Sequence, residues 1–162
     1  MAGKDLTADN RGFSLVEILV TIAILGILVT IGATSFRELN EKYRIEAATK
    51  QFYADLMEGR GRAMQRNRVH YVQMTSNGYT IYDDTNKPVI FGKLSSTITF
   101  PSSGSPGGVM NFQFNRNGIA STAGYVRVQS SVPRVFPDYN CITIAETRIK
   151  MGQYNGAACV EK

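Results

Sequence analysis

An apolar run near the N-terminus dominates the hydropathy pattern of the chain. A polar leader ends at Gly12, an apolar segment begins at Phe13, and residues 18–36 contain no charged side chain. Glu17 is the single charge of this segment before Arg37. Because a helix of about 20 apolar residues spans a bilayer, the pattern predicts a transmembrane helix over residues 13–36.

The apolar residues become periodic after this run. Residues 37–68 contain no proline and are rich in good helix formers. Small and apolar side chains recur there at spacings of three and four, at Ile45, Ala48, Phe52, Leu56, Gly59 and Ala63. This stripe predicts an amphipathic helix over residues 37–67. We therefore expect one long helix over about residues 14–67, with its first half in a membrane.

The remaining residues, 69–162, read as a β-rich region. Strands are expected at residues 69–74, 79–82, 89–94, 98–100, 110–114, 125–129, 141–144 and 148–151. Asn77-Gly78 predicts a hairpin turn, because this pair accepts positive φ, and the composition of residues 101–108 predicts a flexible loop. Alternating residues such as Val126 and Val128 predict an antiparallel sheet with one covered face. The fold class is α+β, with the amphipathic helix half covering the sheet.

Charge and cysteine content narrow the function only partly. The 162 residues suffice for one domain and its membrane helix. The net charge of +5 permits binding to nucleic acid or to an anionic membrane, without showing either. In an exported domain, Cys141 and Cys159 would form a disulfide. Two buried thiols are the alternative.

The patterns that enzymes use are missing from the sequence. It contains no nucleophile elbow, phosphate-binding loop or paired-cysteine metal motif. The single histidine, His70, lies in an expected strand, where a structural or solvated role is the usual one. Asp83-Asp84 predicts a turn, with weak calcium binding as the alternative. We expect no catalytic residue, no bound metal and no cofactor.

Four arginines near the end of the predicted helix form the candidate binding site. Arg60, Arg62, Arg66 and Arg68 fall within nine residues that contain no acidic residue. Helical spacing puts Arg62 and Arg66 on one face of the helix and Arg60 on a different face. These cations either interact favourably with the helix macrodipole or bind DNA. Residues that could extend a basic surface are Tyr71, Lys93, Arg116, Arg127, Arg148 and Lys150.

The hexapeptide Gly12-Phe13-Ser14-Leu15-Val16-Glu17, followed by an apolar helix, resembles the N-terminal signal of type IV pilins and type II secretion pseudopilins. The resemblance implies that a prepilin peptidase removes residues 1–12 and N-methylates Phe13. It also implies that Glu17 neutralises the Phe13 amine of a neighbouring subunit, since unpaired buried charges are costly. Placing a carboxylate near the membrane interior costs about 2.5–3.5 kcal/mol of insertion free energy, which favours transfer of the subunit from the membrane into a filament. The alternative is a solvated Glu17 near the membrane interface.

The soluble half narrows this resemblance to the GspH/FimT family of minor subunits. The similar segments are the helix end around Arg60 to Asn67, Phe114-Asn115-Arg116-Asn117-Gly118, and Thr147 to Gly152. The resemblance implies a type IV pilin-like fold, inner-membrane insertion, a periplasmic domain over residues 37–162 and assembly with other pilin subunits. Pilin-like proteins often carry a C-terminal disulfide, which favours the Cys141–Cys159 bond.

Three functional hypotheses follow. The first is a minor pilin or pseudopilin that assembles into a filament for protein secretion or pilus biogenesis; the sequence does not separate these systems, or a minor from a major subunit. The second is a FimT-like, DNA-binding minor pilin for natural transformation, because Gly59-Arg60-Gly61-Arg62 resembles a Gly-Arg-x-Arg element linked to that activity. The third is a single-pass anchor in which Gly12-Phe13 stays uncut.

Overall fold

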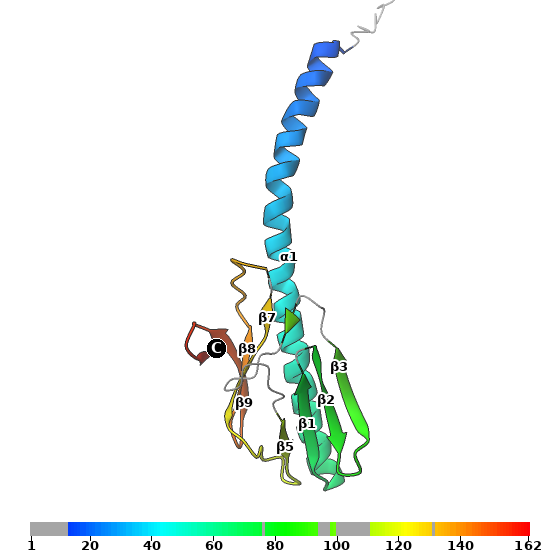
Figure 1. Cartoon of the computed structure of the whole chain (residues 1–162), viewed down its shortest axis with the longest axis vertical. Helices are drawn as coiled ribbons and strands as arrows, with labels where there is room; N and C mark the ends of the chain where they lie inside the picture. The colour runs from blue at the N-terminus through cyan, green and yellow to red at the C-terminus, as the bar shows by residue number, and fades with distance from the viewer. Residues whose placement is uncertain (1–12, 76, 94–97, 100–110, 131) are drawn as a thin grey trace, which may run out of the picture. The chain divides into compact units, whose positions relative to one another are not determined.

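A single long helix and a set of antiparallel strands make up the fold (Figure 1). The structure, a computed structural model, describes residues 13–75, 77–93, 98–99, 111–130 and 132–162. The helix α1 spans Leu15–Arg66 and is followed by strands β1 to β10. This architecture confirms the predicted α+β class. The chain divides into two compact units, Met1–Arg37 and Glu38–Lys162, which are described separately.

The C-terminal end of α1 is closed by an asparagine. Asn67 adopts a positive φ of 51°, and its N–H donates to the carbonyl of Met64 at 3.4 Å. The N–H of Arg68 donates to the carbonyl of Ala63 at 3.1 Å. These two bonds form the left-handed cap that satisfies the last helical carbonyls. The helix therefore ends within one residue of the predicted position.

The strands form two four-stranded sheets and one two-stranded sheet, all antiparallel. The first sheet has the order β3-β2-β1-β5, with strands β1 (His70–Thr75), β2 (Gly78–Asp83), β3 (Pro88–Lys93) and β5 (Asn111–Phe114). The second has the order β10-β9-β8-β6, with strands β6 (Gly124–Arg127), β8 (Cys141–Ile144), β9 (Ile149–Tyr154) and β10 (Cys159–Glu161). Strands β4 (Ile98–Thr99) and β7 (Gln129–Ser130) pair with each other.

This topology divides the predicted antiparallel strands between separate sheets. The strand expected at residues 125–129 is divided between β6 and β7, which belong to different sheets. Strand β10 was not predicted, because a three-residue strand is too short to show a period of two. The loop expected at residues 101–108 lies outside the described residues.

The predicted β1–β2 hairpin is confirmed, although its glycine has a different function. The two strands pair from His70↔Asp83 to Thr75↔Gly78. Gly78 does not adopt a positive φ. A Cβ atom at this position would instead lie 2.3 Å from the carbonyl oxygen of Gly92 on β3. The sheet therefore requires glycine for the close approach of two strands.

The predicted stripe on α1 packs against the sheets of the second unit. Ile45, Phe52, Leu56 and Ala63 are almost completely buried. The rings of Phe52 and Tyr79 lie 4.5 Å apart. A Cβ at Gly59 would lie 2.9 Å from the Cδ1 atom of Ile81, so this glycine allows β2 to approach the helix. Strand residues that complete the core are Val72, Met74, Phe112, Phe114, Val126, Val128, Ile142, Ile144 and Ile149.

A buried carboxylate lies beside this stripe. Asp55 is only 8% exposed and accepts hydrogen bonds from the Tyr79 hydroxyl and from Nε2 of Gln51, the latter at 2.9 Å. Burial first, and the hydrogen bond to Asp55 second, raise the pKa of Tyr79 far above its ordinary value. The sequence analysis did not predict this pair, because an aspartate among mostly polar helix residues is expected to be exposed to solvent.

The Tyr79–Asp55 pair predicts a loss of stability at alkaline pH. The unfolded state releases the tyrosine proton near pH 10, whereas the native state retains it. The free energy of unfolding should therefore fall as the pH rises through about 10. We expect Tyr79→Phe to cost about 1–3 kcal/mol at neutral pH and to flatten this alkaline decline. Urea unfolding followed by circular dichroism measures both; an unchanged decline in the variant would contradict the assignment.

Cys141 and Cys159 form a disulfide between the non-adjacent strands β8 and β10. Strand β9 lies between them, and its Gly152 pairs with both Cys141 and Glu161. A Cβ at Gly152 would lie 3.1 Å from the Sγ atom of Cys159. The disulfide therefore crosses β9 over a glycine and fixes the C-terminal strand.

We expect Cys141→Ser/Cys159→Ser to lower the free energy of unfolding by about 3 kcal/mol. The reason is that the bond closes an 18-position separation and restricts the unfolded chain. Urea denaturation measures the loss. A thiol reductant should reproduce it in the wild type and leave the double variant unchanged. A reductant effect on the variant would show that another process causes the loss.

Candidate functional site

The N-terminal unit holds the residues expected to act in processing and assembly. Gly12 lies outside the described residues, and Phe13 is 80% exposed immediately before α1. The carbonyl of Ser14 accepts the N–H groups of Glu17 and Ile18, at 3.0 and 3.2 Å, and so begins the helix. Glu17 lies exposed in the first turn, where a carboxylate favourably meets the positive end of the helix macrodipole.

The helix beyond Glu17 has an uncovered apolar surface. It contains an 18-residue window of mean hydropathy 2.6, none of which is buried within the structure. By length and composition the helix can cross a membrane. Its side chains that are at least half exposed include Leu19, Val20, Ile22, Ile24, Leu25, Ile27, Leu28, Val29 and Phe36. Apolar surface of this extent requires lipid or other helices to cover it.

Two threonines in this surface have satisfied hydroxyl groups. Thr21 Oγ1 donates to the carbonyl of Ile18, and Thr30 Oγ1 donates to the carbonyl of Gly26, both at 2.8 Å. These bonds remove the cost of exposing a hydroxyl donor to an apolar environment. Glu17 is then the charged side chain that a membrane or a neighbouring subunit must accommodate.

The arginines at the end of α1 are partly neutralised. Arg62 pairs with Glu58 at 2.5 Å, and Arg68 pairs with Asp84 at 3.1 Å. Arg66 is exposed and forms no ion pair within the described part of the chain. Arg60 is half-buried, and its Nε has no hydrogen-bond partner there. Of the four candidate DNA-binding residues, Arg60 and Arg66 thus remain as uncompensated cations.

The residues proposed to extend a basic surface are divided between the two sheets. Tyr71 and Lys93 lie on the first sheet. Lys150 lies on β9 of the second sheet, directly after Arg148 and Ile149, and both Arg148 and Lys150 pair with Glu161, at 3.4 and 2.8 Å. Arg127 stacks on the ring of Tyr154, with 4.3 Å between its Cζ atom and the ring centroid. The structure therefore does not join them into one surface of free cations.

The remaining polar candidates have local structural roles. His70 is fully buried at the start of β1, and its Nδ1 atom lies 3.4 Å from the carbonyl oxygen of Arg68. Asp83 closes the predicted turn by accepting from the Thr85 hydroxyl and from the N–H groups of Thr85 and Lys87. These bonds, the Thr85 hydroxyl first, lower the pKa of Asp83. Within the described residues, no group of three or more His, Cys, Asp or Glu could hold a metal.

The sequence analysis missed polar contacts that join α1 to β7 and to the loop before β8. Glu41 is 4% exposed and accepts hydrogen bonds from Ser130 Oγ and Arg44, at 2.5 and 3.2 Å. The next residue along the helix, Lys42, pairs with Asp138 at 2.9 Å. Charged residues on a helix usually indicate a solvated face, so only the tertiary structure reveals that Glu41 is buried.

Comparisons with known proteins found matches to the N-terminal segment and to the fold. Residues 7–33 match the family model of the prokaryotic N-terminal methylation motif. The crystal structure of the type IV minor pilin FimU from Pseudomonas aeruginosa matches with a TM-score of 0.55 and 16% identity. The match covers 74% of this chain and 98% of that one. No curated protein matches the chain significantly in sequence.

The N-terminal motif and the fold are two separate findings. The chain carries the prokaryotic N-terminal methylation motif at residues 7–33, and it shares with FimU the fold of one long helix on antiparallel sheets. The motif match covers Gly12, Phe13 and Glu17 and so confirms the resemblance stated for the N-terminal segment.

Proposed function

We propose that the chain is a minor subunit of a type IV pilus or of a type II secretion pseudopilus, within the GspH/FimT group. A prepilin peptidase removes residues 1–12 by cutting between Gly12 and Phe13, and Phe13 is then methylated. The observation that carries this proposal is an uncovered apolar helix with an N-terminal methylation motif, joined to a pilin fold.

Before assembly the subunit resides in the inner membrane. Residues 13–36 span the bilayer, and the domain from Glu38 onward lies in the periplasm. The Cys141–Cys159 disulfide supports this location, because disulfides persist in the oxidising periplasm. In the filament, neighbouring helices replace the lipid around the apolar surface of α1.

Glu17 drives the transfer from membrane to filament. Its carboxylate is costly near the bilayer interior, whereas a neighbouring Phe13 amine would neutralise it in a filament. Phe13 is 80% exposed in the isolated chain, and Glu17 is exposed one helical turn away. Both groups are therefore accessible to a second subunit.

We expect Glu17→Ala to insert into the membrane and to be processed normally, but to be lost from filaments. The variant lacks the carboxylate that neutralises the neighbouring amine. Mass spectrometry of the N-terminus tests processing after Gly12 and methylation of Phe13, and immunoblotting of sheared filaments tests incorporation. Glu38→Ala is the matched control, since Glu38 is an exposed carboxylate on the same helix.

Two outcomes would contradict the proposal. Normal incorporation of Glu17→Ala would remove the assembly role of this carboxylate. An uncut and unmethylated N-terminus in the wild type would instead indicate the single-pass anchor. The subunits that co-purify with the wild-type filament identify whether it is a pilus or a secretion pseudopilus.

A second candidate function is DNA capture by the arginine end of α1. The observation that favours it is the exposed Arg66, which has no ion partner among the described residues and follows Arg60 at the helix end. Uncompensated cations release counterions when they contact phosphates, which drives binding. The ion pairs of Arg62 and Arg68 reduce the contribution of these two residues.

If DNA is bound, the full-length protein in detergent should bind duplex DNA with micromolar affinity that weakens steeply with salt. Arg60→Ala/Arg66→Ala should lower the affinity and reduce the salt slope by about one for each lost contact. Arg62→Ala/Arg68→Ala removes the same formal charge from paired positions and should have the smaller effect. Fluorescence anisotropy across salt concentrations measures both; no binding at low salt would leave the arginines as cations that cap a helix end.

A further inference from the structure

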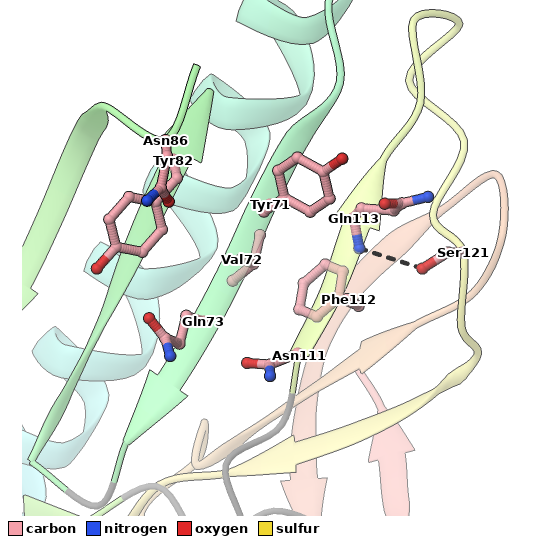
Figure 2. Close-up of a pocket in the computed structure, with 9 residues that line it drawn as sticks. All are labelled: Tyr71, Val72, Gln73, Tyr82, Asn86, Asn111, Phe112, Gln113 and Ser121. Carbon is pink, nitrogen blue, oxygen red and sulfur yellow. Dashed lines mark hydrogen bonds between the residues drawn. The ribbon is translucent and has the colours of Figure 1, made fainter. Parts of the chain in front are cut away.

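The outer face of the first sheet contains a hollow of about 320 Å³ (Figure 2). Strands β1, β2 and β5 and the residues that follow them line it, and α1 lies behind the sheet in this view. Val72 and Phe112 are paired across β1 and β5, are almost fully buried and form its floor. The volume falls within the range of small-molecule sites.

Two rows of side chains cross the strands above this floor. One row runs from Gln113 through Tyr71 to Tyr82, which are register partners on β5, β1 and β2. The second row places Asn111 opposite Gln73. Figure 2 shows both tyrosine rings on the solvent side of the sheet, with the amide groups of Gln73 and Asn111 beside them. Two aromatic rings and three amide groups thus share one surface.

The rim of the hollow is held in place by the backbone. Ser121 forms two hydrogen bonds with the main chain of Gln113, at 3.1 and 2.9 Å. Asn86 lies in a turn with φ of 60°, and its N–H donates to the carbonyl of Asp83 at 3.0 Å. The site is therefore positioned before any ligand binds, which lowers the entropic cost of binding.

The polar side chains of the two rows retain their hydrogen-bonding capacity. Tyr71, Gln73, Tyr82, Asn111 and Gln113 form no side-chain hydrogen bond to any other residue that the structure describes. Each amide offers two N–H donors and one carbonyl acceptor, and each phenol offers one donor and one acceptor. A ligand with several hydroxyl groups can satisfy both kinds of group.

The hollow also lacks charge. None of its nine lining residues is an aspartate, glutamate, lysine, arginine or histidine. The acidic residues of the neighbouring turn are engaged elsewhere: Asp83 accepts three hydrogen bonds within its own turn, and Asp84 pairs with Arg68. The nine lining residues therefore offer neither a cation for a phosphate or sulfate nor a carboxylate for an amine.

We propose that this hollow binds a neutral saccharide. The apolar face of a pyranose ring stacks on Tyr71 or Tyr82, and its hydroxyl groups exchange hydrogen bonds with Gln73, Asn111 and Gln113. Single-stranded nucleic acid fits less well, because such sites combine aromatic rings with cations that follow the phosphates. Strands β1, β2 and β5 supply most of this site, none of whose lining residues is Glu17 or one of the four arginines, and the inference does not depend on the proposed function.

The test uses the full-length protein in a detergent without sugar groups, applied to an array of neutral oligosaccharides. Sialylated and sulfated forms of the same glycans and single-stranded DNA are included. We expect retention on neutral glycans that persists when NaCl is raised from physiological to molar concentration, because no ion pair contributes. Tyr71→Ala should weaken binding about tenfold, which corresponds to about 1.4 kcal/mol.

Tyr43→Ala is the matched control, since Tyr43 is an exposed tyrosine on α1 that does not line the hollow. Gln73→Glu keeps the side-chain shape and removes the amide donors, so it should also weaken binding while the urea unfolding midpoint stays unchanged. Retention of charged glycans or DNA alone, no retention of any neutral glycan, or equal affinity of Tyr71→Ala and Tyr43→Ala would overturn the proposal.

Discussion

The folded domain depends on the packing of one helical stripe against the β-sheets. Phe52 and Leu56 are fully buried, and the ring of Phe52 lies against Tyr79. Gly59 lets the side chain of Ile81 approach the helix more closely than a Cβ would allow. Because α1 supplies one side of the hydrophobic core, the strands have no complete core without it. The same contact places β1 and β2, and with them the outer face of the first sheet.

This requirement explains why one helix contains two different surfaces. After residue 38 the buried apolar residues of the helix form a stripe, because one face meets the sheets and the other meets water. Before that point the side chains are apolar all round and uncovered, which is stable only among lipid tails or other helices. Glu17 is the exception, and a charge in such a surface is retained where a partner exists.

Sequence periodicity was sufficient to predict the helix but was less informative about how the strands are arranged in sheets. The stripe from Ile45 to Ala63 indicated the helix and its buried face, since a spacing of three and four persists over five turns. It did not show that Asp55 is buried, because its donor Tyr79 is 24 positions away. The division of residues 125–129 between two sheets likewise depends on partners distant in sequence, namely β8 and β4.

Net charge was a weaker guide to binding than the location of unpaired charge. The formal +5 suggested a basic surface, and four arginines within nine residues suggested where it lies. The Arg62–Glu58 pair follows from helical spacing, but Arg68–Asp84 joins the helix end to a turn 16 positions later and requires the fold. That ion pair removes a cation from the arginine cluster. It also engages an acid near the hollow on the first sheet, so one contact lowers the charge available at both surfaces. The two proposed sites therefore differ in the ligand expected of each: a polyanion at the arginine cluster and a neutral molecule at the hollow.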